Sequence, residues 1–223
     1  DWSVAEKLVS VCAETFGSVD GLVNNAAVLH NSLPWEEQPT SLKRIVEVNV
    51  LGSMYCGVNA LRHMVEQGSG AIVAITSGAL NGATGITSYG ITKAAVASMV
   101  YGWALEAAGT GVRVNGVMPI AGTGMSKHRY EWFKSSEANA SSAAEQSVQG
   151  PEKVAPVVAY LLSDLSASLN GQIVRHDGQR IVLASRSSWD GAGHQLGDND
   201  KLDVDAVAEI VANLSTRTQE SVR

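Results

Sequence analysis

Short, continuous apolar runs alternate along this chain with longer segments of helical periodicity. Residues 21–24, 71–75 and 112–117 form such runs, each too short for a typical helix and each bounded by polar or glycine residues. Runs without polar alternation are typical of strands that are buried on both faces of a sheet. Strands that alternate with helices predict parallel βαβ units. The sequence therefore predicts an α/β fold with a doubly wound parallel sheet.

The helical segments lie between these runs. Apolar residues recur at helical spacing, and we expect helices over residues 4–16, 42–65, 89–108, 151–162 and 203–215. Gly17, Gly68 and Gly109 follow the first three of these segments as helix stops. Residues 172–174 and 180–183 are predicted to be late strands around a turn at Asp177-Gly178.

Length and composition favour one domain. The chain has 223 residues, of which 45% are hydrophobic, and a chain of this size buries about 70% of its unfolded surface. We interpret residues 1–223 as a single domain of the dinucleotide-binding type. Residues 125–150 are interpreted as a lid inserted over the substrate, and residues 186–223 as a C-terminal extension.

Charge and cysteine content argue against several classes of protein. The net charge of −6 speaks against a nucleic-acid partner, which calls for a basic face. No apolar run reaches about 18 residues, so no membrane span is expected. Two cysteines form no disulfide framework, and five scattered histidines have no metal-ligand spacing. We expect a cytoplasmic protein without a metal site.

Tyr89 and Lys93 carry the strongest chemical signal. They are four residues apart in a predicted helix and therefore share one face. An ammonium beside a phenol stabilises the phenolate and lowers its pKa from about 10. The spacing predicts a tyrosine that acts as an acid or base near neutral pH.

Other polar residues surround this pair in the predicted topology. Asn24 and Ser77 follow two apolar strands, and Asn49 lies in the helical segment between them. Open parallel sheets bind ligands at the carboxyl ends of their strands. The predicted ligand site therefore includes the strand ends near Asn24 and Ser77.

At this point the chain resembles the short-chain dehydrogenase/reductase family. The resemblance rests on five ordered features within residues 1–185: Asn24-Asn25-Ala26-Ala27, Asn49, Ser77, Tyr89 with Lys93, and Val114-Asn115-Gly116-Val117-Met118-Pro119. It implies a Rossmann-like sheet and hydride transfer between NAD or NADP and a small alcohol or carbonyl substrate. In this family a homo-oligomer is usual, and we expect one here.

The resemblance also implies a role for each matching residue. Tyr89 exchanges the substrate proton, Lys93 lowers the pKa of Tyr89, and Ser77 holds the substrate oxygen. Asn49 supports a water in a proton relay. The cofactor-binding residues implied are Asp1, Asn24, Ala26, Tyr89, Lys93, Pro119 and Thr123.

Four alternatives remain open at this point. Asn24 and Asn25 could simply form hydrogen bonds within a turn at the end of a strand. Thr76 competes with Ser77, because it stands thirteen residues before Tyr89 and Ser77 stands twelve. Asn49 could instead be a hydrogen-bonded buried amide. The aromatic side chains of Tyr130, Trp132 and Phe133 could cover a substrate or form the apolar face of a short helix.

The substrate is suggested by two further stretches. Residues 119–126 and 154–162 resemble the 3-hydroxyacyl-CoA dehydrogenase unit of the peroxisomal multifunctional enzyme, which implies an acyl thioester and makes acyl-CoA a candidate. A reductase acting on acyl-carrier-protein thioesters is a further candidate. Lys127, His128 and Arg129 are then its potential docking patch.

The family's Gly-rich cofactor motif does not precede Asn24. The resemblance therefore implies an N-terminally incomplete sheet that lacks the first βαβαβ unit and leaves Leu22 and Val23 on an open edge. A non-catalytic interaction protein, or an inactive fragment of such an enzyme, is the alternative function. Its assembly surface would be the helix face with Val96, Met99, Val100 and Trp103.

Overall fold

The computed structural model describes residues 1–135, 150–184, 206–208 and 210–211. The chain divides into two compact units, Asp1–Ala184 and Ser185–Arg223. The first unit carries a five-stranded sheet with helices on both faces. Within the second unit, residues 206–208 and 210–211 are helical.

The sheet has the strand order β1-β2-β3-β4-β5. Four strands are parallel: β1 (Gly21–Asn24), β2 (Gly70–Ile75), β3 (Val112–Pro119) and β4 (Ile173–His176). The short β5 (Ile181–Leu183) pairs antiparallel with β4. The turn between them has Gly178 at a φ of 89°, and Asp177 accepts hydrogen bonds from the backbone N–H of Gln179 and Arg180. The predicted Rossmann-like parallel sheet is confirmed.

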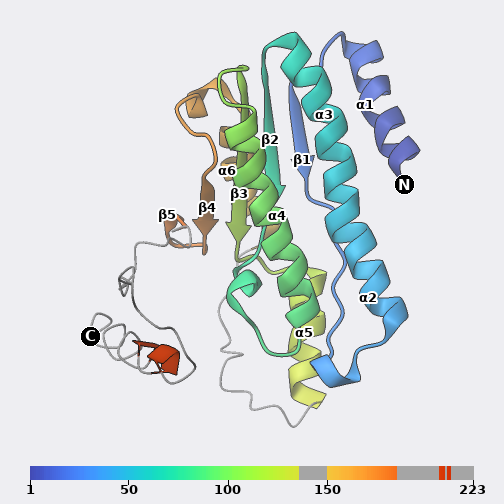
Figure 1. The fold of residues 1–223 in the computed structure, drawn as a ribbon, viewed down its shortest axis with the longest axis vertical. Coiled ribbons are helices and arrows are strands. Elements are labelled where there is room, and N and C mark those ends of the chain that lie inside the picture. Colours follow the sequence, from blue (N-terminus) through green and yellow to red (C-terminus); the bar gives the residue numbers. More distant parts are fainter. Residues whose placement is uncertain (136–149, 185–205, 209, 212–223) are drawn as a thin grey trace. The chain divides into compact units, whose positions relative to one another are not determined.

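Helices cover the two faces of this sheet (Figure 1). On one face α3 (Ser53–Gln67) and α4 (Thr87–Glu106) pack on the strands, and α1 (Trp2–Phe16) packs on α3. Their core includes Met64, Ile72 and Val114. On the other face α6 (Ala155–Leu162) packs on β2 and β3. Ile72 and its neighbour Val73 belong to different core clusters because successive strand residues point to opposite faces.

The predicted helix over residues 42–65 is interrupted in the structure. It consists of α2 (Pro39–Val46), a π-helical turn over Glu47–Gly52, and α3. A π turn inserts extra backbone into a helix and recurs at functional sites. Periodicity alone did not reveal the turn, because the apolar spacing continues through it.

Shorter elements complete the first unit. The segment after β3 contains α5 (Gly124–Ser135), which lies within the predicted lid; the rest of that prediction falls largely on residues 136–149, outside the described residues. The 3-10 turns are Pro34–Glu36, Gly78–Asn81, Pro151–Lys153 and Asp164–Ser166. In the part of the chain that the structure describes, no helix has the length and apolar character needed to cross a membrane.

Candidate active site

A cavity of about 1170 Å³ opens where the parallel strands end. Ile75 and Pro119, the last residues of β2 and β3, both line it. Ligand sites of open α/β sheets are found at this edge. Six of the predicted catalytic and cofactor-binding residues line this cavity: Ala26, Ser77, Tyr89, Lys93, Pro119 and Thr123.

Tyr89 and Ser77 meet within this cavity. Tyr89 lies in the first turn of α4 and is 9% exposed, and its side chain shares a hydrogen bond with that of Ser77. Burial raises the pKa of the phenol above its usual value of 10.0, and the hydrogen bond with Ser77 opposes this shift. The balance in this structure is opposite to the lowered pKa expected from Lys93, because desolvation of the phenolate dominates.

Lys93 lies one helical turn further along α4. Its ammonium nitrogen is 5.6 Å from the centroid of the Tyr89 ring and donates to the backbone oxygen of Ile75 at 2.6 Å. Burial lowers the pKa of Lys93 from 10.5 to about 8. The side chain, only 3% exposed, therefore loses its proton more readily than an exposed lysine does.

The structure separates Ser77 from its competitor Thr76. The Thr76 hydroxyl donates to the backbone oxygen of Val117 at 3.1 Å, and the residue is 1% exposed. Ser77 instead begins the 3-10 turn Gly78–Asn81, where its hydroxyl accepts from the N–H of Ala79 at 3.2 Å. The geometry brings Ser77 to Tyr89 and fastens Thr76 to the sheet.

Gly90 permits the close approach between α4 and this turn. A Cβ at Gly90 would lie 2.4 Å from the backbone oxygen of Ala79, a distance that side chains do not adopt. The absence of a side chain at Gly90 therefore lets the turn after Ser77 rest on the helix that carries Tyr89.

Asn49 lies in the π turn and does not line the cavity. Its side chain accepts from the Val28 N–H at 2.8 Å and donates to the Val28 oxygen at 2.9 Å and to the Thr92 hydroxyl at 3.0 Å. This buried amide ties the loop after β1 to α4. The structure matches the hydrogen-bonded alternative, while a role for Asn49 in proton transfer stays a prediction.

A second cavity of about 840 Å³ adjoins the first and holds the remaining predicted cofactor residues. Asp1 and Asn24 line it, and Ala26 lines both cavities. The Asp1 carboxylate accepts from the N–H and hydroxyl of Ser3, so it caps α1. Asn24 donates to the backbone oxygen of Ser53 at 3.0 Å.

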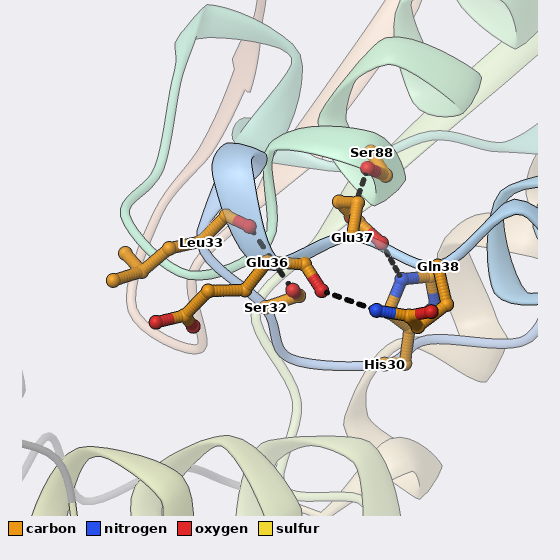
Figure 2. Close-up of polar contacts among 7 residues, drawn as sticks. All are labelled: His30, Ser32, Leu33, Glu36, Glu37, Gln38 and Ser88. Atoms are coloured by element: carbon orange, nitrogen blue, oxygen red, sulfur yellow. Dashed lines mark hydrogen bonds and ion pairs between the residues drawn. The ribbon is translucent and has the colours of Figure 1, made fainter.

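Glu37 forms a contact beside the site that the sequence analysis did not anticipate (Figure 2). One carboxylate oxygen lies 2.7 Å from Nε2 of His30, and the other accepts a hydrogen bond from Ser88. Burial alone would raise the pKa of Glu37, but the hydrogen bonds from Ser88 and His30 and the charge of His30 lower it below 4.5. No local sequence pattern reveals the contacts of Glu37 with His30 and Ser88, because Glu37 and Ser88 are 51 positions apart.

Phe133 and Trp132 of α5 pack against other parts of the fold, whereas Tyr130 is 38% exposed. Phe133 is 4% exposed and packs edge-to-face with Trp132, with ring centroids 5.2 Å apart. Trp132 lies against Gly85, whose φ of 74° turns the loop toward it. Neither aromatic residue lines the large cavity, so the packing alternative describes them better than a substrate cover.

Comparisons with known proteins agree with this arrangement. A family model described as enoyl-(acyl carrier protein) reductase matches residues 1–178. The cis-4-hydroxycyclohexanecarboxylate dehydrogenase of Sinomonas cyclohexanicum is 36% identical over 182 residues, which cover 79% of this chain and 71% of that protein. The chain belongs to the short-chain dehydrogenase/reductase family.

Further members of this family are similar in sequence and structure. The 3-oxoacyl-[acyl-carrier-protein] reductase FabG of Thermotoga maritima is 32% identical, covering 80% of this chain and 71% of the relative. A short chain dehydrogenase from Mycobacterium avium has the same fold, with a TM-score of 0.79 over 97% of this chain and 70% of that chain at 24% identity.

Two solved structures of similar fold contain nicotinamide cofactors. ElxO with NADP bound has a TM-score of 0.70 and 30% identity, covering 80% of this chain and 73% of that one. NAD+-bound xylitol dehydrogenase has a TM-score of 0.72 and 25% identity, covering 80% and 75%. As a short-chain dehydrogenase/reductase, the chain is an oxidoreductase with a nicotinamide cofactor.

The structure corrects the assembly surface that was considered for a non-catalytic protein of this fold. Val96 and Val100 are 1% and 0% exposed and belong to the core beneath α4. Trp103 packs against the position of Gly57 on α3. Val96 and Val100 therefore point into the molecule and belong to no free apolar face, whereas Met99 and Trp103 are half-buried.

Proposed function

We propose that the protein interconverts a small alcohol and its carbonyl compound, with Tyr89 as the acid and base. The observation that supports this proposal is the hydrogen bond between Tyr89 and Ser77 inside the large cavity, with Lys93 at 5.6 Å from the phenol ring. Two hydroxyl groups thereby converge where one substrate oxygen could bind both.

The residues present fit a nicotinamide cofactor. The two adjoining cavities share Asn25, Ala26 and Val48 and so follow one side of the sheet edge, as an extended dinucleotide requires. Pro119 and Thr123 would flank its nicotinamide, whereas Asp1 and Asn24 would meet its adenosine half. When bound, this cofactor would give a hydride to the carbonyl carbon or accept one from the alcohol carbon.

The chain's own residues handle the oxygen and its proton. During carbonyl reduction the C=O π bond breaks, and the oxygen that becomes negative takes a proton from the Tyr89 hydroxyl. The Ser77 hydroxyl donates a hydrogen bond to the same oxygen and holds it in place. Because burial raises the Tyr89 pKa, the phenol carries its proton at neutral pH and is ready to act as the acid. The reverse reaction needs the phenolate and is therefore favoured by higher pH.

Substitution of Tyr89 tests this mechanism. Tyr89→Phe removes the proton donor and keeps the ring, so we expect turnover of NADH or NADPH with a carbonyl panel to fall about 10²–10⁴-fold. Binding of both cofactors, measured by fluorescence titration, should persist. Tyr160→Phe, at an exposed position of α6 outside the large cavity, is the control. If Tyr89→Phe keeps most of the turnover, the proposed role of Tyr89 is wrong.

A 3-oxoacyl thioester is a second candidate substrate. The sequence resemblance of residues 119–126 and 154–162 to a 3-hydroxyacyl-CoA dehydrogenase unit supports it, as does the similarity to FabG. Reduction of acetoacetyl-CoA, compared with the acetoacetyl thioester of N-acetylcysteamine, tests this candidate. Turnover of both thioesters would support it, and turnover of neither would reject it.

A further inference from the structure

The charged side chains that line the large cavity are all basic. They are Lys93, Arg129 and Arg175, and no aspartate or glutamate lies among the described residues of the lining. The chain as a whole carries a net charge of −6, so this local excess of positive charge is opposite to the overall balance. A basic cavity in an acidic protein favours an anionic ligand.

Arg175 lies close to Gly78, the residue after Ser77. It belongs to β4, and its Nη1 lies 3.6 Å from the point where a side chain on Gly78 would begin. Its charge contributes to lowering the pKa of Asp177, but the carboxylate of Asp177 forms its ion pair with Arg180 at 3.6 Å. The guanidinium of Arg175 therefore lies close to Gly78, which directly follows the residue proposed to hold the reacting oxygen.

Arg129 reaches the cavity from α5. Its Nε atom is buried and makes no hydrogen bond with any described residue. Its guanidinium carbon lies 5.4 Å from the centroid of the Phe133 ring, within the range of a cation–π contact. Burial lowers the pKa of Arg129, and the described residues leave its Nε–H without a hydrogen-bond acceptor. The sequence analysis grouped Arg129 with Lys127 and His128 in a potential docking patch. In the structure Lys127 and His128 are exposed, whereas Arg129 is half-buried.

We propose that Arg129 and Arg175 bind a carboxylate of the substrate, and that the substrate is therefore a hydroxy acid or the corresponding oxo acid. This assignment rests on the proposed function. Guanidinium groups match carboxylates with paired, charge-assisted hydrogen bonds. Because Arg175 is close to Gly78, the residue after Ser77, the anionic group lies near the reacting carbon. The phosphates of a thioester carrier are separated from that carbon by a long chain and do not fit this position.

A binding measurement tests the assignment without turnover. Cyclohexanecarboxylate and its neutral methyl ester are titrated by calorimetry, with and without NADH. We expect the carboxylate to bind at least about 10-fold more tightly than the ester. Arg129→Gln and Arg175→Gln should each weaken carboxylate binding about 10–100-fold, as expected for a hydrogen bond to a charged group. Lys127→Gln and Arg180→Gln, which remove exposed charges from the same two regions, are the matched controls and should leave it unchanged.

Each contrary outcome has a separate meaning. The assignment is overturned if the carboxylate binds no better than the ester, if neither compound binds, or if the arginine variants weaken NADH as strongly as the carboxylate. The last result would indicate that the two arginines bind the cofactor. A failure of the proposed function would be detected in a different measurement, the turnover of Tyr89→Phe. This variant should lose turnover and keep carboxylate binding.

Discussion

Ser88 donates a hydrogen bond to the carboxylate of Glu37, which joins the residue just before Tyr89 to a loop 51 positions earlier in the chain. The other carboxylate oxygen lies 2.7 Å from Nε2 of His30, in the loop after β1 (Figure 2). Glu37 thus fastens two segments to the N-terminal end of α4. The position of the proposed acid depends on a carboxylate that takes no part in the proton transfer.

Glu37→Gln should lower the unfolding free energy of the protein at pH 7. The difference in unfolding free energy between this variant and the wild type should become smaller in acid. The hydrogen bonds from Ser88 and His30 lower the pKa of Glu37 below 4.5 despite its burial. A carboxylate with a lowered folded pKa stabilises the fold above its unfolded pKa and loses this contribution as the pH falls through the folded value. Urea unfolding of both proteins between pH 7 and pH 3 measures the effect. Glu36→Gln, on the exposed neighbouring residue, is the control. A difference that stays constant below pH 4.5 would contradict this prediction.

Gly90→Ala should disturb the site, whereas Gly102→Ala in the same helix should not. The new Cβ at position 90 would lie 2.4 Å from the backbone oxygen of Ala79 and would push the turn after Ser77 away from α4. We expect a loss of about 1–3 kcal/mol in unfolding free energy and a fall in kcat. At Gly102 nothing lies within 4 Å, so alanine should stabilise α4 by about 0.5–1 kcal/mol. Thermal melts and turnover of Gly90→Ala and Gly102→Ala test this prediction. Equal effects of the two substitutions would reject the explanation by close approach at Gly90.

Lys93 should make the stability of the protein rise with pH in the alkaline range. Burial lowers its pKa from 10.5 to about 8, so the unfolded chain binds more protons between these two values. Stability then rises with pH over this window, by about 1.4 kcal/mol for each pKa unit of the shift. Lys93→Met should lose this rise, while Lys7→Met on exposed α1 should keep it. Denaturant unfolding between pH 7 and pH 10.5 checks the sign, and parallel curves for wild type and Lys93→Met would refute it.

Asn49→Ala should destabilise the protein more than Asn59→Ala. The Asn49 side chain makes three hydrogen bonds across the fold, to both backbone groups of Val28 and to Thr92. Each buried group left without a partner costs about 1–3 kcal/mol. The equally buried Asn59 makes one bond within its own helix, to the oxygen of Tyr55 at 2.8 Å. Melting temperatures of the two variants measure the contrast. Similar losses would show that the link between the loop and α4 contributes little.

Part of this site follows from local sequence patterns. Tyr89 and Lys93 are one helical turn apart, so any helix over this segment brings them to one face. Ser77 and Pro119 follow apolar strands, and parallel pairing gathers such ends at one edge. The π turn at Asn49 and the contact of Ser88 with Glu37 have no comparable local pattern, because each depends on a partner from a distant element.

By itself the sequence determined the order of helices and strands, the parallel sheet, and the spacing of the serine, tyrosine and lysine. These features depend on periodicity and on neighbours within a few residues, which the chain carries wherever it folds. Only the tertiary structure decided that Ser77 rather than Thr76 meets Tyr89, that burial raises the Tyr89 pKa, and that Arg129 and Arg175 line one cavity. Burial and long-range contacts arise only when separate elements pack together. The spacing of residues within one segment therefore does not reveal them.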